Sequence, residues 1–243
     1  MFTFAPLFTN HYSMAIKRKL EKKNDETLLD LTQARMKANT FFDKNQKLII
    51  GVVAGLVILV GGWFVYNNMI KGPQEEKAMA QMWKAQFQFE QDSFQMALEN
   101  PGGGYSGFLA IAKDFGGTKA GNLANYYAGI CYLNLGNFDA ALTYINDFNP
   151  DGVVGPAMKH GSLGDVYSEL NQMDKAMASY KKASTASDNE LLTPYYLKKL
   201  ALLHESKSEV KEALEIYKTI KSKYPNSNEA LSIDKYIARA EGK

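Results

Sequence analysis

Residues 48–66, LIIGVVAGLVILVGGWFVY, contain no charged side chain. An α-helix rises about 1.5 Å per residue, so a helix of this length spans roughly the 30 Å hydrocarbon core of a bilayer. The segment also lacks the polar face of a helix that packs at the surface of a soluble core. Trp63 and Tyr66 at its end are typical of membrane interfaces. We therefore predict a single transmembrane helix; the alternative is a long buried helix of a soluble domain.

The distribution of basic residues predicts the orientation of this helix. The preceding chain carries Lys17, Arg18, Lys19, Lys22, Lys23, Arg35, Lys37, Lys44 and Lys47, whereas only Lys71 and Lys77 follow closely. Cytoplasmic flanks of membrane helices carry an excess of Lys and Arg. We expect a cytoplasmic amino terminus and an exported remainder. Because the span is too long and too far from the start for a signal peptide, we expect a retained anchor.

The regions that flank the span differ in character. In the tail, residues 1–47, we expect an amphipathic helix over about 26–45, because Leu28, Leu31, Arg35, Ala38 and Phe42 recur on one helical face. This helix would lie on the membrane surface or dock a partner. Residues 1–13 do not resemble folded structure and are either a misassigned start or a disordered tail. After the span, residues 67–74 are expected to form a linker, because Lys71, Gly72 and Pro73 break a helix.

Small residues within the span suggest a contact with another helix. Gly51 and Gly55 form a GxxxG pair, and Gly62 falls on nearly the same face. Glycines allow a second helix to approach closely in lipid. We therefore predict a membrane-helix packing site at these three residues.

Charge and cysteine content exclude several classes for the remaining chain. The formal net charge of +2 is too small for a nucleic-acid-binding protein. Cys131 is the only cysteine, so no intrachain disulfide can form. We expect it to be a small buried hydrophobic residue. The apolar core of an exported domain must therefore supply its stability.

A repeat begins near residue 121. Gly129, Tyr132 and Ala141 recur 35 residues later as Gly164, Tyr167 and Ala176, and a third copy follows with Ala201, His204 and Ala213. The period and residue types resemble the tetratricopeptide repeat (TPR) family over about 121–225. A helix pair over 75–115 resembles a degenerate first unit, and residues 228–241 suit a capping helix. The resemblance implies an all-α fold, in which the transmembrane helix precedes an exported domain, residues 75–243, that forms an α-solenoid of about four TPR-like helix pairs.

In such a solenoid the first helix of each pair lines a concave binding groove. The side chains expected there are mainly apolar, with a few charges: Leu123, Tyr126, Ile130, Leu133, Met158, Asp165, Tyr195, Lys198 and Leu202. Ile130 occupies a position where TPR domains that bind carboxyl-terminal tails use asparagine. An extended or helical apolar segment is therefore the expected ligand. The alternative is that several of these side chains only pack on neighbouring helices.

No pattern in the chain points to catalysis. His160 and His204 fall at ring positions of the repeat and are expected to pack there rather than bind a metal. There is no CxxC motif, nucleophile elbow or phosphate loop. We expect a non-enzyme without cofactors.

The segment FFDKNQKLIIGVVAGLVILVGGWFVY, residues 41–66, followed by an exported TPR domain, resembles the YfgM-like family. That resemblance implies a bacterial inner-membrane protein with its TPR domain in the periplasm, acting as an ancillary subunit or chaperone-like adaptor of the Sec translocon. Implied partners are translocon subunits, a membrane-anchored periplasmic chaperone, or unfolded secretory chains. The alternative is a scaffold of another envelope complex, such as outer-membrane assembly, gliding or cell-wall machinery.

Overall fold

The computed structural model describes residues 10–242, with side chains from residue 32 onward. The chain divides into two compact units, Met1–Tyr66 and Asn67–Lys243. Of the doubtful leader, residues 1–9 lie outside the described residues. Residues 10–13 begin the first helix, so the expectation that they lack structure is wrong.

The described residues of the first unit form a single helix, α1 (Asn10–Val65). It includes both the expected amphipathic segment and the apolar span, without a break between them. Its apolar side chains are exposed, as shown by Ile58 at 72% and Leu59 at 71%. Among the described residues, this is the one helical region long and apolar enough to cross a membrane, and none of its apolar window is buried. That exposure suits a lipid-facing helix and argues against the soluble-core alternative.

Residues 67–74 are helical. The expectation that Lys71, Gly72 and Pro73 break the helix to form a linker is therefore wrong. A π-helical segment, η1 (Tyr66–Lys71), leads directly into α2 (Gly72–Glu90). Pro73 lies in the first turn of α2, where a missing N–H costs no helical hydrogen bond. A π turn is also a common way for a helix to absorb a local irregularity.

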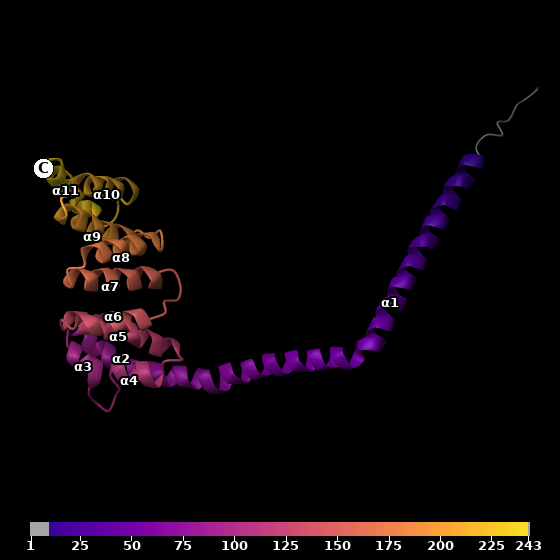
Figure 1. The fold of residues 1–243 in the computed structure, drawn as a ribbon, viewed down its shortest axis with the longest axis horizontal. Coiled ribbons are helices and arrows are strands. Elements are labelled where there is room, and N and C mark those ends of the chain that lie inside the picture. The colour runs from indigo at the N-terminus through magenta and orange to yellow at the C-terminus, as the bar shows by residue number, and fades with distance from the viewer. Residues whose placement is uncertain (1–9, 243) are drawn as a thin grey trace, which may run out of the picture. The chain divides into compact units, whose positions relative to one another are not determined.

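The second unit is a stack of helices, and successive helices pack against one another in chain order (Figure 1). After α2 come α3 (Phe94–Glu99), α4 (Phe108–Asp114), α5 (Lys119–Asn134), α6 (Phe138–Asp147), α7 (Gly155–Glu169), α8 (Met173–Thr185), α9 (Leu192–Ser206), α10 (Val210–Lys223), the 3₁₀ turn η2 (Ala230–Ser232) and α11 (Ile233–Glu241). The described residues contain no strand. The predicted all-α solenoid with a capping helix is confirmed.

Four helix-turn-helix units share one turn geometry. A residue with positive φ ends the first helix of each: Asp92 (55°), Gly136 (76°), Asn171 (54°) and Ser208 (64°). The next N–H then donates to the carbonyl five residues earlier: Ser93 to Gln88, Asn137 to Tyr132, Gln172 to Tyr167 and Glu209 to His204, at 2.8–2.9 Å. This bond is the Schellman closure of a helix end. Because the same closure joins α2 to α3, these two helices begin the first repeat.

Small residues recur on both sides of these turns. A small residue lies seven positions before each turn residue and an alanine five positions after it: Ala85 and Ala97, Gly129 and Ala141, Gly164 and Ala176, Ala201 and Ala213. All six alanines are fully buried. A Cβ at Gly129 would lie 2.4 Å from Ile145 Cγ1. The two helices of this repeat therefore cross closely at these small residues.

The first repeat, formed by α2, α3 and α4, departs from a simple helix pair. Its second helix is divided into α3 and α4 by residues 100–107, where Gly102, Gly103 and Gly104 all have positive φ. The apolar residues of α2 also divide into two sets. Met82 is buried with Ala78 and Ala85, whereas Met79, Trp83 and Phe87 are exposed. Only part of this apolar surface is covered, because a first helix has neighbours on only one side.

A carboxylate from α2 caps the amino-terminal end of α5, the first helix of the second repeat. Glu75 Oε2 accepts a hydrogen bond from the Lys119 N–H at 2.6 Å, and Glu75 Oε1 accepts one from Ala120 N–H at 2.9 Å. The Thr118 hydroxyl accepts from Gly121 N–H at 2.9 Å. Together these groups satisfy the amino-terminal donors of α5 and favour its dipole.

We expect Glu75→Ala to lower the free energy of unfolding by about 1–2 kcal/mol, the usual cost of removing a helix cap. Urea unfolding of the full chain, followed by circular dichroism, measures this loss. Glu76→Ala is the matched control, because the neighbouring Glu76 is exposed and should change stability by less than about 0.5 kcal/mol. Equal effects of the two substitutions would contradict the cap.

Cys131 is fully buried in the core shared by α2, α3, α4 and α5. Burial raises the pKa of its thiol to about 12. The expectation of a small buried hydrophobic residue is confirmed.

Candidate functional site

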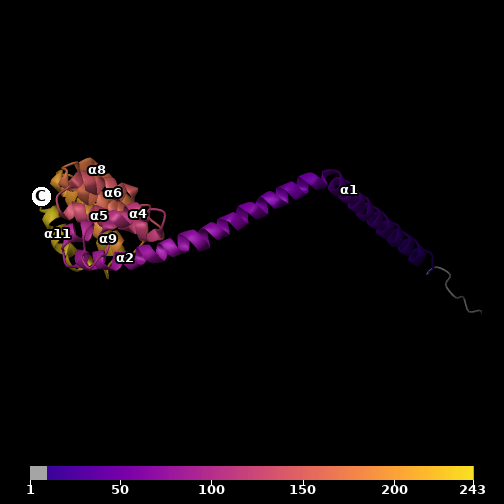
Figure 2. The ribbon, with the colours of Figure 1, turned by 90° about the horizontal axis from the view of Figure 1, so that it is seen from below.

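The two helices of a repeat occupy different sides of the stack. In Figure 2, which looks along the stack, the labels of α6 and α8 lie above those of α5 and α9. The nine predicted groove residues come from α5, α7 and α9, and none of them is fully buried. The first helix of each repeat pair is called helix A. We call the surface made by these nine residues the helix-A face.

Three of the predicted residues lie near one another on this face. Tyr126 of α5 lies within electrostatic range of Asp165 of α7 and Tyr195 of α9. Burial raises the pKa of Tyr126, and the charge of Asp165 adds to this shift. Leu133 and Asp165 line a shared cavity of about 560 Å³. The stacking of successive units thus places an apolar wall beside a carboxylate.

Two residues that sequence reasoning did not assign to the groove complete the centre. Asp165 Oδ1 accepts a hydrogen bond from the Tyr180 hydroxyl at 2.7 Å and one from Lys199 Nζ at 2.5 Å. Lys199 Nζ also lies 5.0 Å from the ring centroid of Tyr195. Burial lowers the pKa of Lys199, but its bonds to Asp165 and Tyr195 outweigh this, and the net shift is upward. The lysine therefore stays charged and balances the carboxylate.

Sequence spacing offered a partial signal for these two residues. Lys199 lies one turn after Tyr195 on α9, so the two share a helical face. Tyr180 lies on α8, and periodicity alone cannot show that its hydroxyl reaches a carboxylate on another helix. Burial raises the pKa of Tyr180, and the negative charge of Asp165 raises it further. Its hydroxyl therefore remains a proton donor.

Of the nine predicted residues, Leu133 and Asp165 line this cavity and the other seven do not. Leu123 packs on the core formed by the first helices. Lys198 Nζ lies 5.1 Å from the ring centroid of Tyr236 on α11. Tyr195 and Leu202 are exposed at 41% and 37%, whereas Ile130 and Met158 are half-buried. The proposed groove thus has a polar centre with apolar side chains around it.

The arrangement suits binding by surface burial and hydrogen bonding. Asp165 Oδ1 is occupied by two donors, and the side chain remains 29% exposed. Within the described residues, no cluster of three His, Cys, Asp or Glu side chains is placed to hold a metal.

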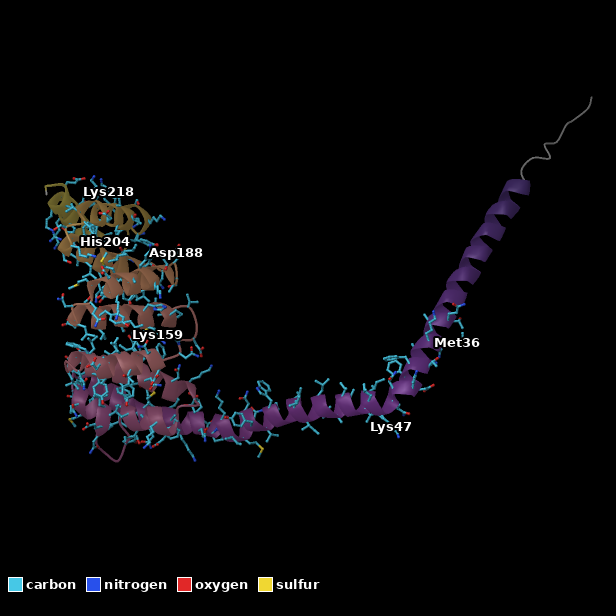
Figure 3. All side chains as sticks on the ribbon, in the orientation of Figure 1. Met36, Lys47, Lys159, Asp188, His204 and Lys218 are labelled. Atoms are coloured by element: carbon cyan, nitrogen blue, oxygen red, sulfur yellow. The ribbon has the colours of Figure 1, made fainter. Side chains whose placement is uncertain are left out.

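Lys159 and His204, labelled in Figure 3, hold successive helices together: Lys159 links α7 to α6, and His204 links α9 to the start of α10. Lys159 Nζ donates to the carbonyls of Asn146 and Phe148 at 2.8 and 2.6 Å, which caps the carboxyl end of α6. His204 Nδ1 lies 2.6 Å from Glu209 Oε2, so this histidine makes a polar contact as well as the expected packing contact. His160 is half-buried; burial, then Lys182 and Lys159, lower its pKa.

The glycines of the predicted membrane-helix site are open. A Cβ at Gly51, Gly55 or Gly62 would meet nothing within 4 Å. This space is what a second helix would need, and the packing site stays a prediction.

Together, the fold and this face define an α-solenoid repeat protein that carries one candidate membrane helix. Two family models described as tetratricopeptide repeat match residues 160–190 and 199–227. These matches overlap α7–α8 and α9–α10, so the chain contains tetratricopeptide repeats. Such repeats are protein-binding modules, which supports protein partners. Comparison with curated proteins and with solved structures found no match.

Proposed function

We propose that this protein is a membrane-anchored tetratricopeptide adaptor that binds protein partners through its helix-A face. We further propose that it serves as an ancillary subunit or chaperone-like partner of the Sec translocon. Its domain order would be residues 1–47 in the cytoplasm, 48–66 in a bacterial inner membrane and the repeats in the periplasm. Residues 41–66 support the finer proposal, because they resemble the YfgM-like family.

One observation supports the binding role: residues of three successive repeats lie near one another on a partly exposed surface. Asp165 of α7 lines one cavity with Leu133 of α5, Lys199 of α9 links Asp165 to the ring of Tyr195, and Tyr126 of α5 lies within electrostatic range of Asp165. Tyrosines offer a large contact area with little rotamer entropy to lose. A segment lying across the three helices would bury them together.

The mechanism we propose is reversible binding without a covalent step. Anchoring the repeats beside a membrane channel would raise their effective concentration for chains or subunits at that site. Weak binding would then suffice. Gly51 and Gly55 would add a second contact, between the span and a membrane helix of the partner complex.

The test is purification of the tagged full chain in mild detergent, with mass spectrometry of the co-purifying proteins. We expect translocon subunits or a membrane-anchored periplasmic chaperone. Gly55→Leu should reduce their recovery about tenfold, because a branched side chain separates closely packed helices. Gly61→Leu is the matched control, since Gly61 is equally open but lies on another face of the helix.

A second pair of variants tests the helix-A face. Tyr195→Ser with Leu202→Ser should reduce recovery of periplasmic partners about tenfold if the exposed apolar groups are binding hot spots. Leu231→Ser is the control, because Leu231 is 84% exposed in η2, away from α5, α7 and α9. Recovery of a different envelope complex would favour the scaffold alternative and overturn the translocon proposal.

A further inference from the structure

The first helix of the solenoid has two apolar faces, and only one of them is covered. Ala78, Met82 and Ala85 are at most 1% exposed in the core. Met79, Trp83 and Phe87 follow one another at four-residue spacing and are 58%, 50% and 47% exposed. Side chains at this spacing form a continuous stripe along one helical face. We call these three residues the α2 stripe.

Neighbouring contacts hold the α2 stripe in place. The Trp83 ring packs edge-on against Tyr105 with centroids 5.1 Å apart. Gln81 Oε1 accepts a hydrogen bond from Ser106 N–H at 2.9 Å, which fastens the same loop to α2. Lys84 Nζ lies 5.4 Å from the Trp83 ring centroid and 5.0 Å from that of Phe87. A partner would therefore meet a partly ordered surface, which lowers the entropic cost of binding.

A carboxylate lies on the same helical face at each end of the α2 stripe. Glu76 precedes Met79 by three residues, and Glu90 follows Phe87 by three. Both are exposed, and neither forms an ion pair within the described part of the chain. At about 1.5 Å per residue the two positions lie roughly 21 Å apart along α2. An apolar stripe bounded by two acidic residues is thus presented to solvent.

We propose that the α2 stripe docks an amphipathic helix of a partner protein whose apolar face is bounded by Lys or Arg at both ends. Three large side chains with a tryptophan at their centre match the aromatic hot spots of helix-binding surfaces. Basic residues at the ends of the partner helix would meet Glu76 and Glu90. The α2 stripe belongs to α2 alone, so this docking is separate from binding at α5, α7 and α9.

The same charges oppose a second copy of this chain as the occupant. An antiparallel pair of α2 helices centred on Trp83 would place Glu76 opposite the Glu90 of its partner. A parallel pair in register would place each glutamate opposite its own copy. Like charges in contact are unfavourable and suppress the wrong pairing. A basic partner helix avoids this repulsion.

The experiment uses the full chain in phosphatidylcholine nanodiscs with Trp63→Phe, which leaves Trp83 as the only tryptophan. The probe is an alanine-based helical peptide with leucines at i, i+4 and i+8 and a lysine three residues beyond each outer leucine. A matched peptide carries glutamate in place of lysine. We expect the lysine peptide to shift Trp83 emission to shorter wavelength and to bind at least tenfold more tightly than the glutamate peptide.

Charge reversal and apolar truncation supply the decisive variants. Glu76→Lys with Glu90→Lys should invert the peptide preference. Met79→Ser with Phe87→Ser should weaken binding of both peptides at least tenfold. Leu231→Ser should change neither, since Leu231 is exposed but lies outside α2. Circular dichroism confirms that each variant is folded.

Three results would overturn the proposal. The first is equal affinity for the two peptides. The second is a blue-shifted Trp83 spectrum before any peptide is added, which would mean that lipid covers the α2 stripe. The third is self-association in sedimentation that Met79→Ser with Phe87→Ser abolishes, which would assign the α2 stripe to a second copy.

Discussion

Gly161→Ala is expected to lower the free energy of unfolding of the repeat domain, residues 67–243, by about 2–3 kcal/mol, because overpacking a close-packed core is destabilising. A Cβ at Gly161 of α7 would lie 2.1 Å from Tyr196 Cε1 and Cζ on α9. Tyr196 is only 6% exposed, so its ring has little room to move. The loss should appear although alanine favours a helix over glycine by about 1 kcal/mol. Thermal unfolding by circular dichroism measures it, at about 2–4 °C per kcal/mol for a domain of this size.

A control and a rescue separate this clash from a general effect of substitution. Gly117→Ala should be nearly neutral, because a Cβ at Gly117 meets nothing within 4 Å. Combining Gly161→Ala with Tyr196→Leu should destabilise less than the sum of the two single changes, since the smaller side chain leaves space for the added methyl group. Additive losses would show that the two residues do not limit each other's packing.

Arg239→Met is expected to lower the free energy of unfolding by about 2–3 kcal/mol by removing the cation that offsets a buried carboxylate. Arg239 of α11 bonds to both carboxylate oxygens of Glu205 on α9, and the Glu205 side chain is only 6% exposed. The Tyr217 hydroxyl of α10 donates to Glu205 Oε2 at 2.8 Å. This network joins the last three helices. We place its cost below that of a fully buried pair because the Arg239 side chain is 48% exposed.

The cost should be reversible by removing the whole network. A triple variant with Glu205→Met, Tyr217→Phe and Arg239→Met should be within about 1 kcal/mol of the natural chain, because apolar replacement of a buried ion pair is often neutral. Urea unfolding of both variants measures the difference. A triple variant less stable than Arg239→Met would mean that the polar network itself stabilises the cap. Lys221→Met is the control, because its ion pair with Asp234 joins α10 to α11 at the exposed surface.

The repeat architecture could be predicted because its code is local and periodic. The recurrence of Gly129, Tyr132 and Ala141 indicated both the helices and their crossings. The first unit was harder, because its second helix is interrupted by residues 100–107 and its turn residue is Asp92. Its small residues, Ala85 and Ala97, keep the same spacing from that turn as their counterparts in later units. This spacing is the regular part of a repeat that the sequence predicts only as a degenerate helix pair over 75–115.

The candidate binding face was predicted only in outline. Helical spacing identified which side chains of α5, α7 and α9 point the same way, because that depends on one helix at a time. It could not show that Lys199 and Tyr180 both bond to Asp165, because these three residues lie on three helices. The same limit applies to Glu75, whose carboxylate caps a helix more than 40 residues later in the chain.

The sequence by itself determined the apolar helix, the all-α class and the period of the stack, since hydropathy and residue spacing act over a few turns of helix. Only the tertiary structure decided which apolar residues of α2 are covered and which charges meet. Met82 and Trp83 are neighbours in the chain, yet one is buried and the other is half exposed. Their environments differ because a helix at the start of a solenoid packs against the stack on only one of its sides.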